Sequence, residues 1–283
     1  MSGSDEKTTD ASIRVRCWGT RGSLPVSGPK FSAYGGNTVC TEIRCGPHTL
    51  LFDAGSGILP AGKKLTEEGV SSFNIFFSHS HYDHIIGLPF FAPFFVSDTP
   101  VKIWSGHLYG NMSTEQMINE VIRPPWFPVT PDIFRADISC NDFKPGDDLH
   151  PHPGMVIKTG NLNHIGGAVG YRVEWGGRSV AIITDTEHTP GSLDPEVLAL
   201  IEDCDLFLYD SHLLDSEMEE YRGYGHSTWQ QAIRLARKSG SRKVGFIHHA
   251  TWRTDTEIKE FDLQAKAEFP ESFFARDGQI IDM

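Results

Sequence analysis

The amino-acid sequence predicts a layered α/β fold built around one large core. Short runs of apolar and β-branched residues alternate with segments of helical spacing in both halves of the chain, and such alternation is typical of helices packed on sheets. The 283 residues, 39% of them hydrophobic, exceed the roughly 150 of a typical domain, but α/β folds reach about 250 residues as one unit. We therefore expect a disordered polar segment over residues 1–12 and a single domain over residues 13–283.

The first part of the chain is predicted to consist mainly of strands. Runs rich in β-branched and aromatic residues, bounded by turn residues, predict strands over residues 13–18, 39–44, 49–52 and 73–78. The last of these runs, FNIFFS, shows no alternation of polar and apolar residues, which is typical of a strand buried on both faces. Before it, Leu59, Ala61 and Leu65 recur at roughly helical spacing, so we expect a helix that ends at Gly69.

The second half repeats this rhythm of strand and helix. The same signals predict strands over residues 156–162, 170–175, 179–184, 206–210 and 243–247, and helices over residues 195–202 and 228–239. For the last helix, Ser227 is the expected N-cap and Gly240 the residue that ends it.

The segment between the two halves, residues 88–153, has a different character. Aromatic residues and prolines are interleaved in LPFFAPFF and VIRPPWFPVTPDIF, and one helix is expected over residues 114–122. The segment is too apolar for a linker and too rich in proline for continuous regular structure. Three interpretations stay open: a lid over the site, a subunit contact in a homodimer, or additional core with an edge strand.

Composition excludes several classes of protein. The 25 basic and 37 acidic side chains give a formal net charge of −12, which argues against a broad basic face that grips extended nucleic acid. No run of about 18 apolar residues occurs, so no membrane span is expected. The five cysteines are an odd number without zinc-ribbon spacing, which favours reduced thiols and a cytoplasmic protein.

The strongest chemical signal is the cluster HSHYDH directly after the buried strand. It places His79, His81, Asp83 and His84 within six residues, and imidazole and carboxylate are ligands of zinc-class metals. His79 and His81 project to one side of the chain, while Asp83 and His84 come from the following turn. Because these ligands cannot all converge on one ion, two adjacent ions account for the excess.

Two ions need further ligands, which must come from other strand ends. His164, Asp185 and His248 each follow a predicted strand at the same kind of position. A single histidine after a strand is more often a hydrogen-bonded turn or core residue. The recurrence of the pattern at three strand ends favours a shared metal site.

The pattern of His79, His81, Asp83 and His84, preceded by Asp53 at a strand end and followed by the three further residues, resembles the metallo-β-lactamase superfamily of di-metal hydrolases. The segments GTRGS at residues 19–23, TDT at residues 184–186 and GHST at residues 225–228 resemble, more narrowly, its tRNase Z-like and small phosphodiesterase branch.

The resemblance implies an αββα four-layer sandwich, in which helices flank two mixed β-sheets and the metals lie at the sheet edge. It implies two zinc ions, with manganese and iron as alternatives. One ion would be held by His79, His81 and His164 and the other by Asp83, His84 and His248, with Asp185 bridging them. Alignment of the motifs favours His248 over its neighbour His249 as the ligand, and Asp53 would orient a ligand by hydrogen bonds.

The resemblance also implies catalytic roles. His226 would protonate the leaving group, Asp210 would hold His226 protonated, and Asp83 would act at the metal centre. The tRNase Z branch carries His-Glu-Ala-Thr where this chain has Tyr209-Asp210-Ser211-His212, so the carboxylate is kept. Arg21, in the first loop, is expected either to pair with a substrate phosphate or to be an ordinary surface arginine.

The expected function is hydrolysis of a small or cyclic nucleotide-type phosphodiester by a hydroxide that bridges two metals. The alternatives are hydrolysis of a lactone, thioester or amide at the same site, processing of tRNA 3′ ends, and a non-catalytic metal-binding module. The sequence has no long basic arm rich in glycine and proline of the kind that clamps tRNA, and none of the expected ligands is missing. A small-molecule substrate is therefore favoured over extended nucleic acid or a membrane.

Overall fold

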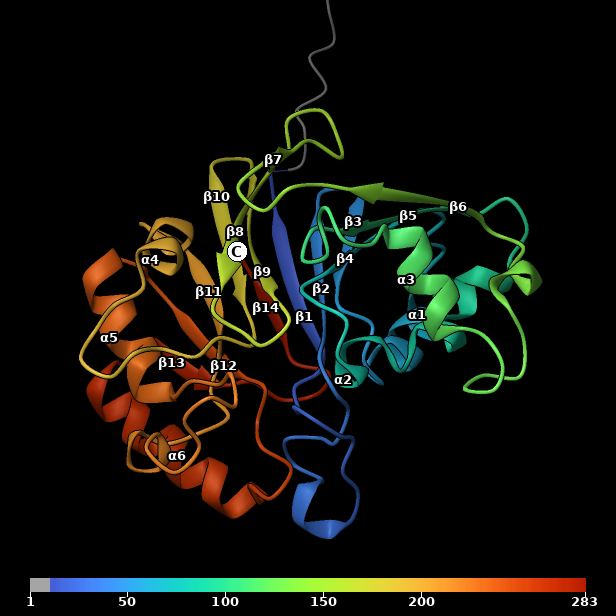
Figure 1. The fold of residues 1–283 in the computed structure, drawn as a ribbon. Coiled ribbons are helices and arrows are strands. Elements are labelled where there is room, and N and C mark those ends of the chain that lie inside the picture. The colour runs from blue at the N-terminus through green and yellow to red at the C-terminus, as the bar shows by residue number, and fades with distance from the viewer. Residues whose placement is uncertain (1–10) are drawn as a thin grey trace, which may run out of the picture.

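The structure is a computed structural model that describes residues 11–283, and it contains two seven-stranded mixed sheets (Figure 1). The first sheet has the spatial order β14 (Ile280–Asp282), β1 (Ile13–Gly19), β2 (Cys40–Cys45), β3 (His48–Phe52), β4 (Phe73–Phe77), β5 (Pro100–Ser105) and β6 (Asp137–Asp142). The second has the order β13 (Ser272–Phe274), β12 (Val244–Ile247), β11 (Leu206–Asp210), β10 (Arg178–Ile183), β9 (Ala168–Trp175), β8 (Val156–Leu162) and β7 (Asp148–Leu149).

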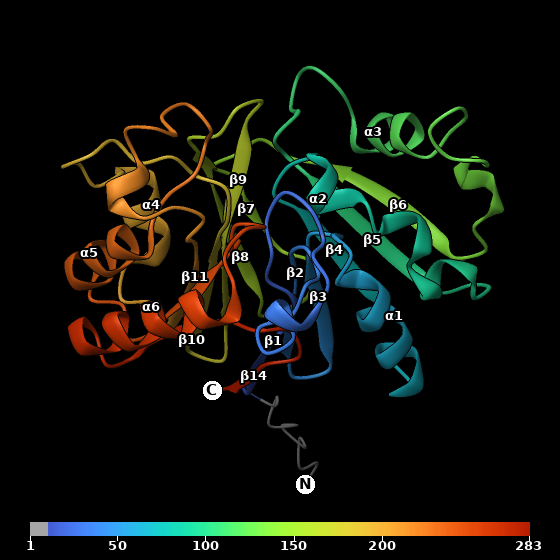
Figure 2. The same cartoon turned by 90° about the horizontal axis from the view of Figure 1, so that it is seen from below.

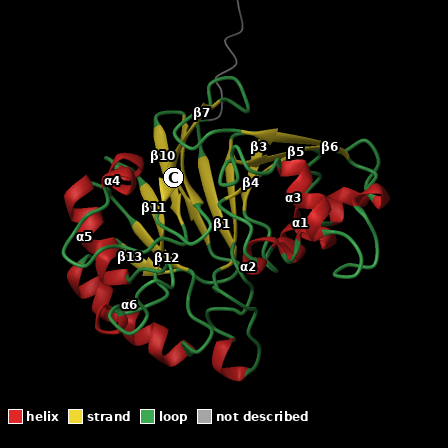
Figure 3. Cartoon of the chain, in the orientation of Figure 1, coloured by secondary structure: helices red, strands yellow, loops and turns green. Residues whose placement is uncertain are grey.

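Helices cover the outer face of each sheet, while the inner faces pack on one another (Figures 2 and 3). The helices are α1 (Ile58–Glu67), α2 (Tyr82–Ile85), α3 (Thr114–Val121), α4 (Pro195–Ile201), α5 (Trp229–Ser239) and α6 (Asp255–Glu268). Buried residues of α1 and α3 pack on the first sheet, and those of α4, α5 and α6 on the second. The four layers confirm the predicted αββα sandwich.

The strand β4 shows how sequence pattern and burial agree. All five of its residues are buried. Phe76 packs into the core between the sheets, whereas Phe73, Ile75 and Phe77 pack against the outer helices. A strand with apolar neighbours on both faces needs no polar side, which explains why β4 is apolar except for Asn74, whose buried side chain accepts a hydrogen bond from Trp104.

Capping residues set the ends of α5 with one difference from the prediction. Gly240 ends the helix in the left-handed conformation, at φ 73°, which glycine adopts without a Cβ clash. The N-cap is Thr228, whose hydroxyl accepts a hydrogen bond from the Gln231 backbone N–H. Ser227, the predicted cap, instead has its hydroxyl 2.7 Å from His188 Nδ1. The prediction was one residue early because both residue types cap well.

The segment 88–153 contributes two strands to the edge of the first sheet. β5 and β6 run parallel to β4 and extend the sheet beyond it, while a capping box of Ser113 and Gln116 starts α3 above them. These two strands agree with the interpretation of additional core with an edge strand, while a lid and a subunit contact stay predictions. Val121, at the end of α3, also reaches the candidate site described below.

The last part of the chain holds three elements that we did not predict. They are α6, β13 and β14, of which β14 returns to the first sheet and pairs antiparallel with β1. No helix within residues 11–283 has the length and apolar character needed to cross a membrane. The predicted disordered segment lies outside the described residues except for its last two positions.

Candidate metal centre

The strand ends of both sheets bring the predicted ligands to one edge of the sandwich. β3 and β4 are parallel, as are β10, β11 and β12, and β8 has the same direction as β10 because each is antiparallel to β9. The carboxyl ends of these strands therefore meet at the same edge, a common location for sites in α/β proteins. The loop after β4 faces the residues that follow β8, β10 and β12.

Three imidazoles form the first group of candidate ligands. His81 Nδ1 lies 2.9 Å from His79 Nε2 and 3.0 Å from His164 Nε2. These three nitrogens lie within 4.8 Å of one another. The remaining nitrogen of His164, Nδ1, donates a hydrogen bond to the Gly225 carbonyl at 2.8 Å, so its Nε2 is unprotonated in the neutral ring and can ligate.

Asp83, His84 and His248 form the second group. Asp83 Oδ2 lies 3.1 Å from His248 Nε2 and 3.4 Å from His84 Nε2. His84 Nδ1 donates to Asp53 Oδ2 at 2.9 Å, which directs Nε2 toward the group. Asp53 is itself held by the backbone N–H and hydroxyl of Ser78 at 2.7 and 2.8 Å. Asp53 thus orients His84, and whether His84 is a metal ligand stays a prediction.

Asp185 lies between the two groups. Its Oδ2 is 3.7 Å from both His79 Nε2 and His164 Nε2, whereas its Oδ1 is 3.2 Å from both His84 Nε2 and His248 Nε2. Each oxygen of one carboxylate therefore faces one group, which is the arrangement that a bridging ligand requires.

The donor atoms fit divalent metal ions of the zinc class. Nitrogen and carboxylate oxygen are the preferred ligands of such ions, and His84 Nε2 is buried without a hydrogen-bond partner. A buried polar atom without a partner is costly, and a cation at this position would satisfy it. Burial lowers the pKa of His79 well below its usual value, which keeps its imidazole neutral as a ligand must be.

Backbone strain accompanies the site. Asp53, Asp185 and His248 adopt φ values of 62°, 47° and 62°, and the left-handed region costs a residue with a side chain about 1–3 kcal/mol. Asp53 and His248 come directly after β3 and β12, and Asp185 is the second residue after β10, so each turn directs a side chain into the site rather than along the sheet. Strain of this kind gathers at functional sites.

Two glycines from the motifs noted in the sequence pack against ligand rings. A Cβ on Gly22 would lie 2.2 Å from His248 Cε1, and a Cβ on Gly225 would lie 2.3 Å from His164 Nδ1. Next to Gly22, the backbone N–H of Ser23 donates to Asp83 Oδ2 at 2.7 Å. Both motifs therefore hold ligands in place, a role that the sequence analysis did not assign to Gly22, Ser23 or Gly225.

Asp210 and His226 form a buried ion pair beside the metal groups. His226 Nδ1 donates to Asp210 Oδ2 at 3.0 Å. Burial opposes the charge on His226, but Asp210, together with Asp185 and Asp83, raises the pKa of His226 to about 9. Asp210 also accepts hydrogen bonds from the backbone N–H groups of Thr186 and His212. The pair thus holds a protonated imidazole with Nε2 as the nitrogen that can act on a substrate.

His249 lies away from both groups. Its Nε2 donates to the Ala275 carbonyl at 2.8 Å, and its ring packs on Phe274. The geometry therefore favours His248 as the ligand, although His249 is its immediate neighbour in the chain.

We expect His248→Ala to lower metal content and activity far more than His249→Ala, because losing a ligand outweighs losing a neighbour outside the site. Metal per folded chain, measured on purified variants together with thermal unfolding, checks this. Thermal unfolding separates a loss of metal binding from a loss of stability. This control is needed because His249 is buried and its replacement is expected to lower stability. The opposite order of metal loss would show that His249 is the ligand.

Arg21 does not occupy the predicted substrate-binding position. Its side chain is fully buried, and Nη1 donates to the carbonyls of Arg253 at 2.7 Å and Ala250 at 3.3 Å, while Nε donates to that of Gly35 at 2.9 Å. The guanidinium therefore joins the first loop to the segment between β12 and α6. The prediction was wrong because the sequence does not reveal that these two loops pack together.

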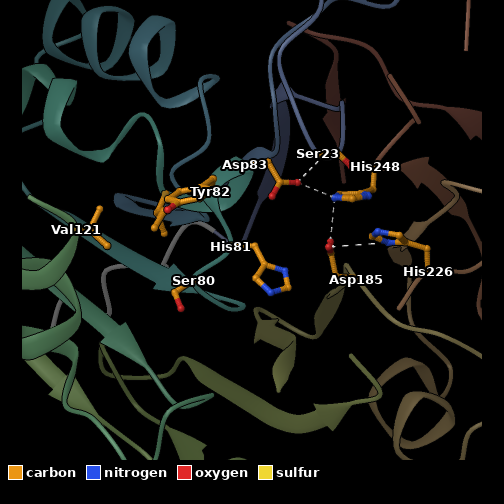
Figure 4. A pocket seen from close by; sticks show the side chains of 10 residues that line it. Ser23, Ser80, His81, Tyr82, Asp83, Val121, Asp185, His226 and His248 are labelled. Carbon is orange, nitrogen blue, oxygen red and sulfur yellow. Dashed lines mark hydrogen bonds and ion pairs between the residues drawn. The ribbon is translucent and has the colours of Figure 1, made fainter. Parts of the chain in front are cut away.

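A cavity of about 550 Å³ opens at the metal groups. Its wall includes Asp83, Asp185, His226 and His248, and on another side Tyr82 and Val121 (Figure 4). This volume is in the range of small-molecule sites. Sequence reasoning missed Tyr82 and Val121 because neither carries a ligand or a charge.

Known proteins align with most of this chain at low sequence identity. The chain is 24% identical over 276 residues to Ribonuclease Z of Lactiplantibacillus plantarum, which covers 82% of this chain and 87% of that protein. It is 25% identical over 284 residues to Ribonuclease Z of Gemmatimonas aurantiaca, covering 83% and 87%.

Solved structures show the same fold. The metallo-beta-lactamase fold protein YhfI of Bacillus subtilis superimposes with a TM-score of 0.70 at 17% identity, covering 96% of this chain and 100% of that one. A diphosphatase of the PhnP family gives 0.69 at 17% identity, covering 96% and 97%. The short form of human tRNase Z gives 0.66 at 20% identity, covering 95% and 98%.

The match to a family is equally extensive. Residues 48–249 match the beta-lactamase superfamily domain, a range that contains every candidate metal ligand. Together with the αββα sandwich and the cluster of histidines and aspartates at its edge, this match identifies the chain as a hydrolase of the metallo-β-lactamase superfamily.

Proposed function

We propose that the protein is a phosphodiesterase that hydrolyses small or cyclic nucleotide-type phosphodiesters with two zinc-class ions. The observation that carries the proposal is the Asp210–His226 pair, whose imidazole lines the same cavity as the candidate metal ligands. A proton donor beside a metal centre suits a reaction with a poor leaving group such as an alkoxide, because the donor can protonate that group as it departs.

Two groups of side chains would hold the ions. His79, His81 and His164 would bind one and Asp83, His84 and His248 the other, with Asp185 contributing one oxygen to each. Metal ions bound here would supply charge neutralisation at phosphorus and a water molecule of lowered pKa.

His226 would move the proton that the leaving group needs. With Nδ1 bonded to Asp210, the proton available to a substrate is the one on Nε2. Transfer of that proton to the departing ester oxygen avoids a free alkoxide, and a positioned acid of this kind contributes about 10²–10⁴ in rate. Asp210 would stabilise the charge on the ring before the transfer.

The cavity supports a small substrate rather than an extended polyanion. Among residues 11–283, no lysine or arginine lines it, and the formal net charge of the chain is −12. Binding along nucleic acid depends on such cations at successive phosphates. Cleavage of RNA is the second candidate, because two relatives at 24% and 25% identity bear the name Ribonuclease Z.

A substrate panel tests the proposal. The purified protein, with its metal content measured, is assayed on cyclic and linear nucleotide diesters, a thioester, a lactone and a structured RNA with a 3′ extension. We expect turnover of the small diesters to exceed that of all other substrates. Turnover confined to the thioester or lactone, or to the RNA, would contradict the proposal and support that alternative.

A further inference from the structure

The cavity at the metal groups has two chemically different sides. On one side lie the polar side chains Asp185, His226 and His248, and on the other lie Tyr82 and Val121, as Figure 4 shows. Ile85 is a further apolar residue of the cavity wall. His226, Asp185 and His248 therefore lie away from Tyr82 and Val121, whereas Ser80 and the candidate ligand His81 lie between the two sides in this view.

Tyr82 is placed on the apolar side by the short helix that carries two ligands. α2 begins at Tyr82 and continues with Asp83 and His84, whose side chains point into the fold and are buried. Tyr82, next to Asp83, points away from the core instead: its side chain is 79% exposed and lines the cavity. Within residues 11–283 its hydroxyl has no hydrogen-bond partner, unlike that of the buried Tyr171.

Val121 faces Tyr82 from a separate element. It ends α3, and the pair Pro124-Pro125 that follows prevents the helix from continuing further. The two side chains thus form a wall from two elements whose positions are set independently by the metal-ligand loop and by the edge of the first sheet. An exposed aromatic face beside an aliphatic side chain suits a flat apolar ring.

We propose that Tyr82, with Val121 and Ile85, binds an aromatic ring on the ester group that stays on phosphorus, as a nucleobase or aryl group would. This inference rests on the proposed function. His226 lies on the opposite side of the cavity and serves the leaving oxygen, so the ring at Tyr82 belongs to the retained group. Among residues 11–283 no lysine or arginine lines the cavity, which further favours a ring over additional phosphates.

Two diesters with the same leaving group test the inference. Methyl 4-nitrophenyl phosphate and phenyl 4-nitrophenyl phosphate both release 4-nitrophenolate, so any difference arises from the retained group. For the wild-type protein we expect kcat/KM for the phenyl ester to exceed that for the methyl ester about tenfold, since stacking on an aromatic side chain has an effect of this size. Tyr82→Ala is expected to remove most of this preference, whereas Tyr82→Phe keeps it.

A binding measurement makes the test independent of turnover. Diphenylphosphinate and dimethylphosphinate contain no ester bond and cannot be hydrolysed. In the metal-loaded protein, Tyr82→Ala is expected to raise the Kd of diphenylphosphinate about tenfold and that of dimethylphosphinate less than twofold. Tyr109→Ala, which removes a tyrosine that is 56% exposed and lies outside this cavity, should change neither value.

The outcomes separate the inference from the proposed function. If the wild-type protein hydrolyses neither diester, the proposed function fails, and the two phosphinates still decide the role of Tyr82. If both diesters are hydrolysed and Tyr82→Ala lowers kcat/KM for both alike, the proposed function stands and the inference is overturned. Metal content measured on each variant excludes an indirect effect through the neighbouring Asp83.

Discussion

Replacing His226 with alanine is expected to lower turnover by about 10²–10⁴ on diesters with an alkoxide leaving group, while the protein keeps its metals. The reason is that an alkoxide departs slowly unless it receives a proton, and His226 holds that proton beside the metal groups through its 3.0 Å bond to Asp210. On a 4-nitrophenyl diester the loss should shrink sharply, because nitrophenolate departs without a proton. The measurement is kcat on both classes of ester for wild type and variant.

Two controls make this result specific. Asp210→Asn should show the same dependence on the leaving group more weakly, because it removes the charge beside His226 but leaves the imidazole in place. Metal analysis is needed because the ring nitrogens of His226 also lie within 4.8 Å of donor atoms of His164 and Asp185. Loss of metal in His226→Ala would identify His226 as a ligand, and an equal loss on both esters would indicate a role in substrate binding or folding.

Asp185→Ala is expected to abolish detectable turnover and to lower the metal content from about two ions per chain to less than one. Its two oxygens face different groups of ligands, at 3.2 Å and 3.7 Å from the nearest imidazole nitrogens. Removing it therefore weakens both sites at once and leaves neighbouring imidazoles without the carboxylate between them. Metal analysis under metal-replete conditions without chelator, combined with activity on a 4-nitrophenyl diester, provides the measurement.

Asp185→Asn is the cleaner companion variant. Asparagine tolerates the left-handed backbone that Asp185 adopts at φ 47° better than alanine does, so it removes the charge with less strain. We expect it also to lose metal, since an amide is a weaker ligand than a carboxylate. A chain that holds one ion or none while wild-type activity persists would contradict the two-ion interpretation.

The fold and the grouping of the candidate ligands were both accessible from the sequence, for a physical reason. Parallel strands end at the same edge, so polar residues that follow strands far apart in the chain become neighbours. The same reasoning applies to His164, Asp185 and His248, which the structure brings beside the HSHYDH loop. Whether these side chains bind metal stays a prediction.

Other features depend on packing between loops, which local patterns do not report. Arg21 was expected to be available to a substrate, but its neighbours Gly35 and Ala250 come from distant segments that fold over it. Tyr82 is likewise inconspicuous in sequence, since its exposure follows from the direction of its ligand-bearing neighbours. The prolines of segment 88–153 mask the sequence pattern of β5 and β6. Pro100 occupies the first position of β5, where a strand tolerates proline.

The pairing of β14 with β1 has a consequence for the synthesis of the chain. Val15 lies opposite Ile281, so one edge of β1 stays open until β14, more than 260 residues further along the chain, has been synthesised. An unpaired strand edge is a template for association with other chains, and pairing over so long a separation is slow. In a nascent chain, the open edge of β1 therefore needs protection from association with other chains for a long time. Shortening β14 should promote aggregation before it affects the chemistry of the metal centre.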